Sequence, residues 1–310
     1  MEMIKSAIPD AIDIICRVMG CVSDDIADIE LLKKGMTNKS ISFCVGSGPK
    51  EGKYIMRIPG EGTDKLINRH NEEEVFKAIS GVGICDAPVY INPNNGYKIT
   101  RYIENTRVCN VKNDTDITKC MAKLRSLHKL ELRVGHEFDI FAQLEFYEQL
   151  WQGKPSVYDD YLETKEKIIR LKEVIDGLDK GWCLTHIDAV SDNFLFYPTV
   201  DGDEGLQLVD WEYSGMQDPH VDVAMFGIYA KYNKQQMDKL IDIYFENKCD
   251  KQTRLKIYCY IAVCGLLWSN WCEYKHKLGV EFGDYSLHQY RYAKEYFVYA
   301  NNMLKMENDK

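Results

Sequence analysis

The stretch His186-Ile187-Asp188-Ala189-Val190-Ser191-Asp192-Asn193 is followed, seventeen residues after Asn193, by Asp210-Trp211-Glu212. Short apolar and aromatic runs flank both motifs. Trp182–Thr185 precedes the first motif, Phe194–Tyr197 follows it, and Leu206–Val209 leads into the second. Runs of this length and composition are typical of strands. The polar side chains of the two motifs are therefore expected where strands end.

Three of these side chains carry oxygen atoms at the spacing that Mg·ATP-dependent phosphoryl transfer requires. The carboxylate of Asp188 can orient a substrate hydroxyl and accept its proton, and His186 stands beside it as a candidate catalytic residue. The amide oxygen of Asn193 and the carboxylate of Asp210 are hard ligands suited to Mg²⁺. Taken singly, such residues are typical of turns. Together, in a strand-loop-strand context, they predict a kinase catalytic loop that uses ATP as co-substrate.

The whole chain has 310 residues, enough for two lobes with separate cores. Its composition is that of an ordinary globular protein, and its net charge of −9 argues against nucleic-acid binding while favouring a cationic substrate. The best apolar run, 257–268, is too short for membrane insertion. The N-terminus lacks a signal-peptide pattern, and the eleven cysteines lack C-x-x-C spacing. A cytoplasmic protein with reduced thiols is expected.

The N-terminal part is predicted to begin with a short helix around Pro9–Met19, followed by strands at Ile26–Lys33 and Ser40–Val45. The turn between these strands contains one glycine and ends at Thr37 and Asn38. In a kinase, such a hairpin lies over the nucleotide phosphates, so Thr37 and Asn38 are candidate nucleotide-binding residues. A hairpin turn with one glycine is also common without any ligand.

A third strand is predicted at Gly52–Ile58, and a helix at Asp64–Ser80 with Asp64 as its cap. The strands Ala87–Ile91 and Tyr97–Thr100 are predicted to form a hairpin around an Asn- and Gly-rich turn. Beyond residue 105 the pattern changes to helices, because apolar residues recur at spacings of three and four. The predicted helices are Asp114–Leu130, Ile140–Trp151, Tyr158–Leu178 and Arg254–Tyr274.

This order of elements predicts an α+β fold with two lobes. A small, strand-rich, nucleotide-binding lobe would span residues 1–102, and a larger, mainly helical, catalytic lobe would span 103–310, with a hinge at about 101–105. Backbone groups of Arg101, Tyr102 and Ile103 in that hinge are candidates for binding the adenine edge.

A kinase also needs a cation on the third strand, where it contacts the α- and β-phosphates and is held by a Glu from the next helix. Arg57 is the residue that this chain offers, since arginine binds phosphate oxygens and stays charged when buried. Its partner is predicted to be Glu72 or Glu73. An exposed Arg57 beside a solvated acidic run is the alternative.

These residues resemble the choline kinase branch of the aminoglycoside-phosphotransferase and protein-kinase-like superfamily, in its bacterial form. The resemblance rests on Gly35-Met-Thr-Asn38, Met56-Arg57-Ile-Pro-Gly60, Asp210-Trp-Glu-Tyr-Ser214 and Leu267-Trp268-Ser269. It implies a kinase of choline or ethanolamine, with Asp188 as base. It implies Asn193 and Asp210 as Mg²⁺ ligands, Glu212 as a second acidic ligand, Arg57 on the phosphates and Glu72 as its partner.

Choline has no N–H to donate, so a protein recognises its head group by charge and by aromatic faces. The candidates for such a cage are Trp211, Tyr229, Tyr232, Trp268, Trp271, Tyr274 and Tyr290. The resemblance makes Trp268 the first of them. Aromatic residues at helical spacing are also typical of cores. The chain departs from eukaryotic members in two places: Met225-Phe226-Gly227 stands where they carry a Glu-Trp pair, and Gly265 where they carry the first of two tryptophans.

The alternatives within the enzyme class are an ethanolamine kinase, a thiamine or methylthioribose-type kinase, and an aminoglycoside phosphotransferase. A noncatalytic pseudokinase is the alternative from another class, and the presence of Asp188, Asn193 and Asp210 argues against it. The partner is expected to be a small molecule, and the sequence leaves the oligomeric state open, a homodimer included.

Overall fold

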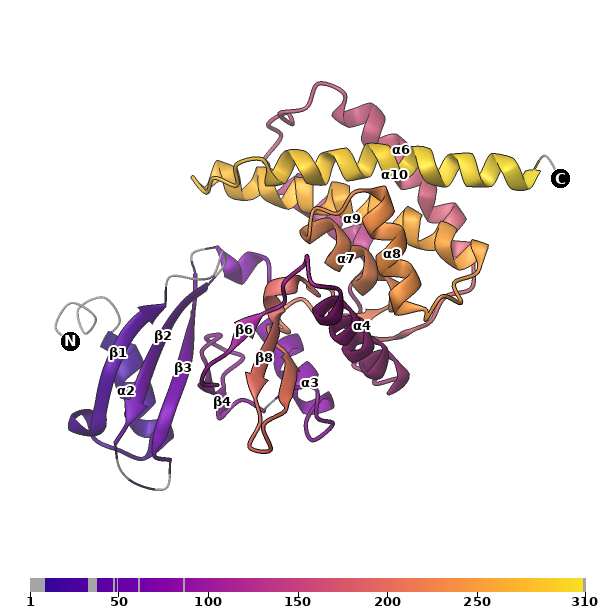
Figure 1. Cartoon of the computed structure of the whole chain (residues 1–310). Coiled ribbons are helices and arrows are strands. Elements are labelled where there is room, and N and C mark those ends of the chain that lie inside the picture. Colours follow the sequence, from indigo (N-terminus) through magenta and orange to yellow (C-terminus); the bar gives the residue numbers. More distant parts are fainter. Residues whose placement is uncertain are drawn as a thin grey trace. The chain divides into compact units, whose positions relative to one another are not determined.

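The protein is described by a computed structural model that covers residues 9–308 except 33–37, 47, 49, 61 and 86 (Figure 1). The chain divides into two compact units. The first contains the described residues up to Arg107 together with Tyr197–Gln207, and the second contains Val108–Phe196 and Leu208–Lys310 as far as they are described. The predicted α+β class is confirmed, because an antiparallel sheet precedes a helical C-terminal part.

The first unit is built on a five-stranded antiparallel sheet of order β1-β2-β3-β5-β4. Its strands are β1 (Ile26–Leu32), β2 (Asn38–Val45), β3 (Gly52–Pro59), β4 (Tyr90–Ile91) and β5 (Lys98–Arg101). Helix α2 (Pro9–Met19) packs its apolar face against this sheet through Ile15, while Phe43 and Tyr54 supply buried rings from the strands. The predicted N-terminal helix and strands are thereby confirmed, with β4 shorter than expected.

The helix predicted at Asp64–Ser80 begins later than expected, and Asp64 is not its cap. A short 3-10 turn occupies Thr63–Lys65, and α3 runs over Arg69–Ala78. Asn68 caps α3, because its side chain accepts the backbone N–H groups of the helix's second and third residues. The later start places Glu72 in the first turn of α3.

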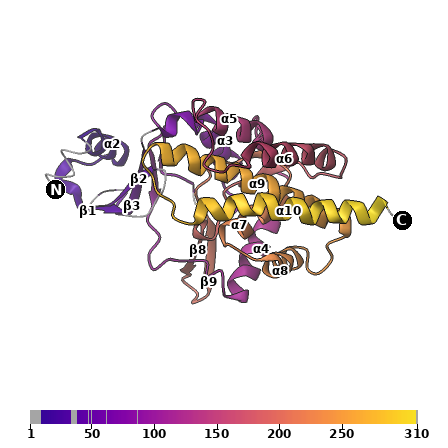
Figure 2. The same cartoon turned by 90° about the horizontal axis from the view of Figure 1, so that it is seen from above.

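The second unit is centred on α9 (Lys251–Lys277), which is buried along most of its length. It confirms the buried helix predicted there. Figure 2 shows α5 (Ile140–Gln149) and α6 (Tyr161–Asp176) on one side of α9, with α7 (His220–Tyr229) and α10 (Tyr285–Asn308) on another. None of the helices in the described part of the chain has the length and apolar character that crossing a membrane requires.

Helix α10 packs closely against α9 at Gly265. A Cβ atom at this position would lie 2.7 Å from the carbonyl oxygen of Gln289 and 2.9 Å from the backbone nitrogen of Ala293. Backbone atoms cannot move aside as a side chain can, so the helix contact requires glycine here. This contact explains why the chain has no tryptophan at Gly265.

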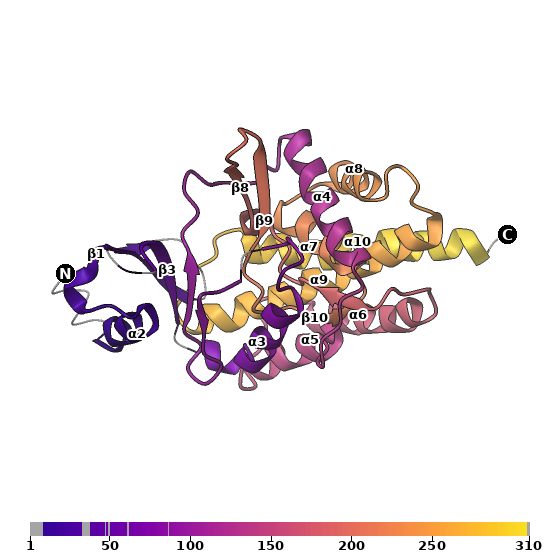
Figure 3. The same ribbon diagram turned by 90° about the horizontal axis from the view of Figure 1, so that it is seen from below.

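The two motifs lie between short strands, as predicted. Strand β7 (Cys183–Thr185) pairs with β10 (Gly215–Gln217). Strands β6 (Arg107–Val108), β8 (Phe194–Pro198) and β9 (Glu204–Leu208) form a sheet of order β6-β8-β9, and β8 and β9 run side by side in Figure 3. Helices α4 (Asp114–Lys129) and α8 (Lys234–Tyr244) complete this part of the fold.

Candidate active site

The loop after β7 carries the first motif in a constrained backbone conformation. Ile187 has a φ of 70°, and Asp210, two residues after the end of β9, has a φ of 67°. A left-handed conformation is rare for a β-branched residue and persists only where the surroundings hold it. The backbone at Ile187 therefore needs a specific anchor.

Asp222 provides this anchor from the first turn of α7. Its Oδ1 accepts the backbone N–H of Ile187 at 2.7 Å, and its Oδ2 accepts that of His186 at 3.0 Å. The carboxylate is completely buried, and Nε2 of His128 lies 2.9 Å from Oδ2. Each oxygen of a buried charge thus has hydrogen-bond partners, which offsets the cost of desolvation.

His186 lies inside the protein. Its Nε2 is 3.0 Å from the carbonyl oxygen of Val209, and because a carbonyl only accepts, Nε2 carries the proton. Burial lowers the pKa of His186 to about 4, so the ring is neutral near pH 7. The ring also meets Trp211 edge to face at 4.5 Å between centroids. His186 therefore connects the candidate catalytic loop to the residues on either side of Asp210.

Asp188 and Asn193 are joined directly. The Nδ2 atom of Asn193 donates to the backbone oxygen of Asp188 at 2.8 Å and to its Oδ2 at 3.1 Å. Burial, with the nearby carboxylates of Asp210 and Glu212, raises the pKa of Asp188 to about 8. The structure thus brings together the four polar residues that the sequence predicted, and two of them, Asp210 and Glu212, are carboxylic acids close enough to raise the pKa of Asp188.

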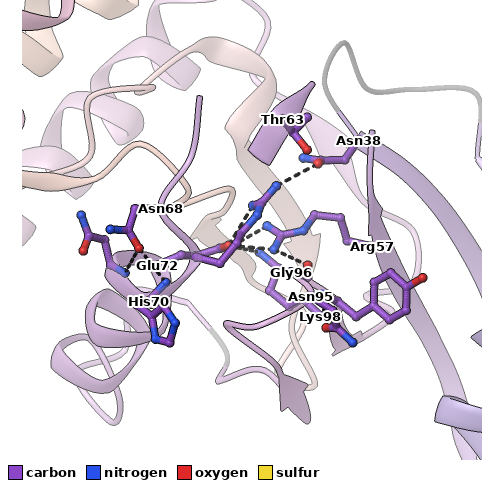
Figure 4. A network of polar contacts seen from close by, with 12 residues as sticks. Asn38, Arg57, Thr63, Asn68, His70, Glu72, Asn95, Gly96 and Lys98 are labelled. Atoms are coloured by element: carbon purple, nitrogen blue, oxygen red, sulfur yellow. Dashed lines mark hydrogen bonds and ion pairs between the residues drawn. The ribbon is translucent and has the colours of Figure 1, made fainter. Parts of the chain in front are cut away.

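The first unit holds Arg57 in a buried charge cluster (Figure 4). Nη2 of Arg57 donates to Oε2 of Glu72 at 2.7 Å and to the carbonyl oxygen of Gly96 at 2.9 Å. Arg69 and Lys98 each lie 3.0 Å from the same carboxylate. Burial alone would raise the pKa of Glu72, but Lys98 and Arg57 hold it far below its usual range. Glu72 is therefore ionised and orders three cations.

Of the two partners predicted for Arg57, the structure selects Glu72. Glu73 instead pairs with Lys77 on a more exposed face of α3. Asn38 lies at the start of β2, and its Oδ1 accepts from Nη2 of Arg69 at 3.2 Å. The predicted nucleotide-binding residue Thr37 lies outside the described residues.

The residues predicted to bind the adenine edge lie at and beyond the end of β5. Arg101 is its last residue, and its guanidinium group lies over the ring of Tyr54. The backbone N–H of Tyr102 donates to the carbonyl oxygen of Lys53 at 2.9 Å, so the sheet already uses this group. Ile103 is half-buried.

Aromatic residues of the second unit form a chain of ring contacts. Tyr213 meets Trp268 edge to face at 5.7 Å, Trp268 meets Trp271 at 5.6 Å, and Trp271 meets Phe282 at 5.2 Å. Tyr229 donates its hydroxyl to Asp192 and contacts Tyr285 at 6.0 Å.

The other aromatic residues considered from the sequence have different surroundings. Trp211 is completely buried, and its Nε1 donates to the carbonyl oxygen of Leu208. Tyr290 stacks on Tyr158, and Tyr232 donates to the backbone of Val111. In this conformation Trp211 exposes no surface to a substrate.

Comparison with known proteins decides the family. The model of the choline/ethanolamine kinase family matches residues 29–261. This chain belongs to that family. It is therefore a small-molecule kinase.

Relatives and solved structures agree with this assignment. Protein LicA of Haemophilus influenzae is 29% identical to this choline/ethanolamine kinase family member over 272 residues, which cover 81% of this chain and 95% of that protein. The crystal structure of choline kinase LicA from Streptococcus pneumoniae matches with a TM-score of 0.78 and 26% identity, covering 96% of this chain and 99% of that one. A structure of LicA in complex with AMP has a TM-score of 0.74 and 26% identity, covering 89% and 92%.

The polar residues of this kinase fit a magnesium ion by their chemistry. Since Nδ2 of Asn193 is committed to Asp188, its Oδ1 is the atom available to a metal, and Asp210 adds a carboxylate. Within the described ranges, no group of three or more His, Cys, Asp or Glu side chains is arranged to hold a metal. Mg²⁺ does not require one, because it is commonly bound by one or two protein oxygens together with phosphates and water.

Several residues of the candidate site were not proposed from the sequence. Tyr213 was quoted within the second motif but not proposed for the cage, and Phe282 and Tyr285 stand in a segment whose structure was not predicted. Tyr147 was missed altogether. Its buried hydroxyl has no hydrogen-bond partner in the described structure, and its pKa is raised by burial and by the charges of Asp188 and Glu212. Its place in α5, far away in the sequence, left no local signal.

Proposed function

We propose that this kinase transfers the γ-phosphoryl group of ATP to the hydroxyl of choline and so forms phosphocholine. The observation that carries the choice of substrate is the chain of ring contacts from Tyr213 through Trp268 and Trp271 to Phe282. Aromatic faces attract a quaternary ammonium group through their negative quadrupole and demand no hydrogen-bond donor from it. The similarity to choline kinase LicA from Streptococcus pneumoniae supports the same choice.

In the proposed reaction, the ionised form of Asp188, which the charge of a bound Mg²⁺ would favour, orients the choline hydroxyl towards the γ-phosphorus and accepts its proton as the new P–O bond forms. The bond to the bridging oxygen then breaks, and ADP leaves. Asn193 holds Asp188 in position through two hydrogen bonds. Asn193 and Asp210 would hold Mg²⁺, which when bound neutralises charge on the β- and γ-phosphates.

Arg57 is proposed to contact the nucleotide phosphates. Glu72 and the carbonyl oxygen of Gly96 fix the direction of its guanidinium group, so little conformational entropy is lost on binding. His186 is assigned a positioning role, because its ring is buried, neutral and bonded to the backbone of Val209.

Ethanolamine is the second candidate substrate. A primary ammonium group needs acceptors for three N–H groups, and Glu212 is the buried carboxylate next to Tyr213 that could serve it. An aminoglycoside presents several ammonium groups and would require several carboxylates, whereas rings predominate in this part of the second unit. A pseudokinase would bind nucleotide without turnover.

The test is an ADP-release assay with Mg·ATP across choline, ethanolamine and a panel of aminoglycosides, with the phosphorylated product identified by mass spectrometry. We expect the highest kcat/KM with choline. A higher kcat/KM with ethanolamine would assign the enzyme to that substrate, and turnover of the aminoglycosides alone would overturn the proposal. Binding of ATP without release of ADP for any acceptor would identify a pseudokinase.

A further inference from the structure

Lys275 is a buried cation within the aromatic region of the second unit. It lies on α9, one helical turn beyond Trp271, and only 3% of its surface is exposed. Its Nζ is 5.8 Å from the centroid of the Trp271 ring. No ion pair joins Lys275 to a carboxylate in the part of the chain that the structure describes, so the indole face is the contact identified for its charge.

One carboxylate acts on this ammonium group electrostatically, without an ion pair in the described structure. Burial lowers the pKa of Lys275, and the charge of Glu212 partly opposes that effect. Glu212 is itself 6% exposed. Lys275 thus lies over an aromatic face and is acted on by a negative charge, which are the two features that attract a quaternary ammonium ligand.

We propose that Lys275 is a specificity-determining residue whose ammonium group competes with the cationic head group of the substrate for the face of Trp271 and the charge of Glu212. This inference rests on the proposed function, since it requires a cationic substrate at these rings. Before binding, Lys275 supplies the positive charge that the substrate supplies in the complex. Binding must displace or repel it, so Lys275 weakens the affinity for every cationic acceptor.

Lys277 provides a matched control on the same helix. Its Nζ lies 4.5 Å from the centroid of the Trp151 ring, so it is also a lysine over a buried tryptophan. Trp151, however, contacts Tyr161 and not the chain of rings from Tyr213 to Phe282. Removing the charge of Lys277 should leave choline binding unchanged.

The experiment compares Lys275→Met with the wild-type enzyme by calorimetric binding of two ligands. One is choline, and the other is its carbon analogue, in which an uncharged tert-butyl group replaces trimethylammonium. We expect the Kd of choline to fall roughly fivefold in Lys275→Met and that of the analogue to change less than about twofold, because only choline is repelled by a like charge several ångströms away. Lys277→Met should match the wild type for both ligands.

Lys275→Arg keeps the charge and should not reproduce the tighter binding, and Lys275→Gln replaces Lys275→Met if the latter does not fold. Equal shifts for choline and the analogue would show an effect of shape alone and overturn the inference. Unchanged or weaker choline binding in the neutral variants would overturn it as well. A wild-type enzyme that binds neither ligand would instead contradict the proposed function.

Discussion

The carboxylate of Asp222 accepts the backbone N–H of Ile187 at 2.7 Å and holds this residue at a φ of 70°. The conformation turns the chain immediately before Asp188. A second bond to the N–H of His186 makes the attachment bidentate. The position of the candidate base therefore depends on a charge thirty-four residues away in the sequence, at the start of α7.

Replacing Asp222 with Asn should impair turnover without removing substrate binding. An amide can accept only one of the two backbone N–H groups, so Ile187 is expected to relax and Asp188 to shift. We expect kcat to fall roughly 100-fold, the size of effect that an ångström of misplacement produces. Steady-state kinetics would measure kcat and both KM values, and circular dichroism would check folding. A folded variant with unchanged kcat would show that the anchor is dispensable.

Glu72 should be important for stability as well as activity. Replacing it with Ala leaves Arg57, Arg69 and Lys98 buried together, and we expect a loss of about 3 to 5 kcal/mol in the free energy of unfolding. Glu73→Ala, on the neighbouring position, removes an exposed pair with Lys77 and should cost less than about 1 kcal/mol. Urea denaturation measures both. Equal losses in the two variants would refute the assignment of Glu72 as the buried counter-ion.

Much of the fold follows from local sequence patterns. The helix Pro9–Met19 was predicted with its observed bounds, and the central buried helix was predicted within three residues at each end, because apolar spacing and turn residues are local signals. Helix α8 was not predicted, although Met237, Leu240, Ile241 and Tyr244 recur on one face and could have identified it.

Helix α10 gave a weaker signal. Its buried face is formed by Tyr292, Ala293, Tyr296 and Ala300. Tyrosine is amphipathic and alanine is common on both faces of helices, so apolar periodicity does not distinguish this face. The close contact at Gly265 depends on α10 and could not be predicted without it.

Some residues of the candidate site were also predictable from local sequence, while others depend on the fold. Asp188, Asn193 and Asp210 lie in two short motifs, so their grouping was predictable from spacing. The contact of Lys98 with Glu72 joins residues twenty-six positions apart through the fold of the sheet, and no local pattern indicates it. The choice of Glu72 over Glu73 was within reach, because Glu72 shares a helix face with the buried Val75 and Phe76.

Trp268 should contribute to substrate binding more than to nucleotide binding. Its ring contacts both Tyr213 and Trp271, so Trp268→Ala removes the centre of the aromatic chain. We expect the KM for choline to rise roughly tenfold, the loss expected for one cation–π face, and the KM for ATP to change little. Trp151→Ala serves as the control for loss of a buried indole. A choline KM equal to that of the wild type would exclude Trp268 from the cage.

The stability of the protein should fall as the solution is acidified from neutral pH, in part because of His220. Burial lowers the pKa of His220 to about 4, against about 6.5 for an unfolded chain. Between these two pKa values, His220 is therefore protonated in the unfolded state and neutral in the folded state. The contribution of His220 is fully present above about pH 6.5 and is lost progressively towards pH 4, by up to about 3 kcal/mol.

His220→Gln should reduce this pH dependence, and the exposed His70→Gln should retain it. Thermal or urea unfolding at intervals between pH 4 and pH 7 would measure how the free energy of unfolding of each variant changes with pH. The folded and unfolded pKa values of His220 define this pH range. If wild type and His220→Gln lose stability in parallel, His220 is not a source of the acid sensitivity.

The most direct test of the account is phosphocholine formation by the wild-type enzyme and by Asp188→Asn, followed by ³¹P NMR with Mg·ATP and choline. We predict that the wild type forms equal amounts of phosphocholine and ADP. Asn has the shape of Asp but cannot accept the hydroxyl proton, so the variant should be slower by roughly 1,000-fold, within the range of general base catalysis. Absence of phosphocholine from the wild type, or equal rates in the two proteins, would contradict the account.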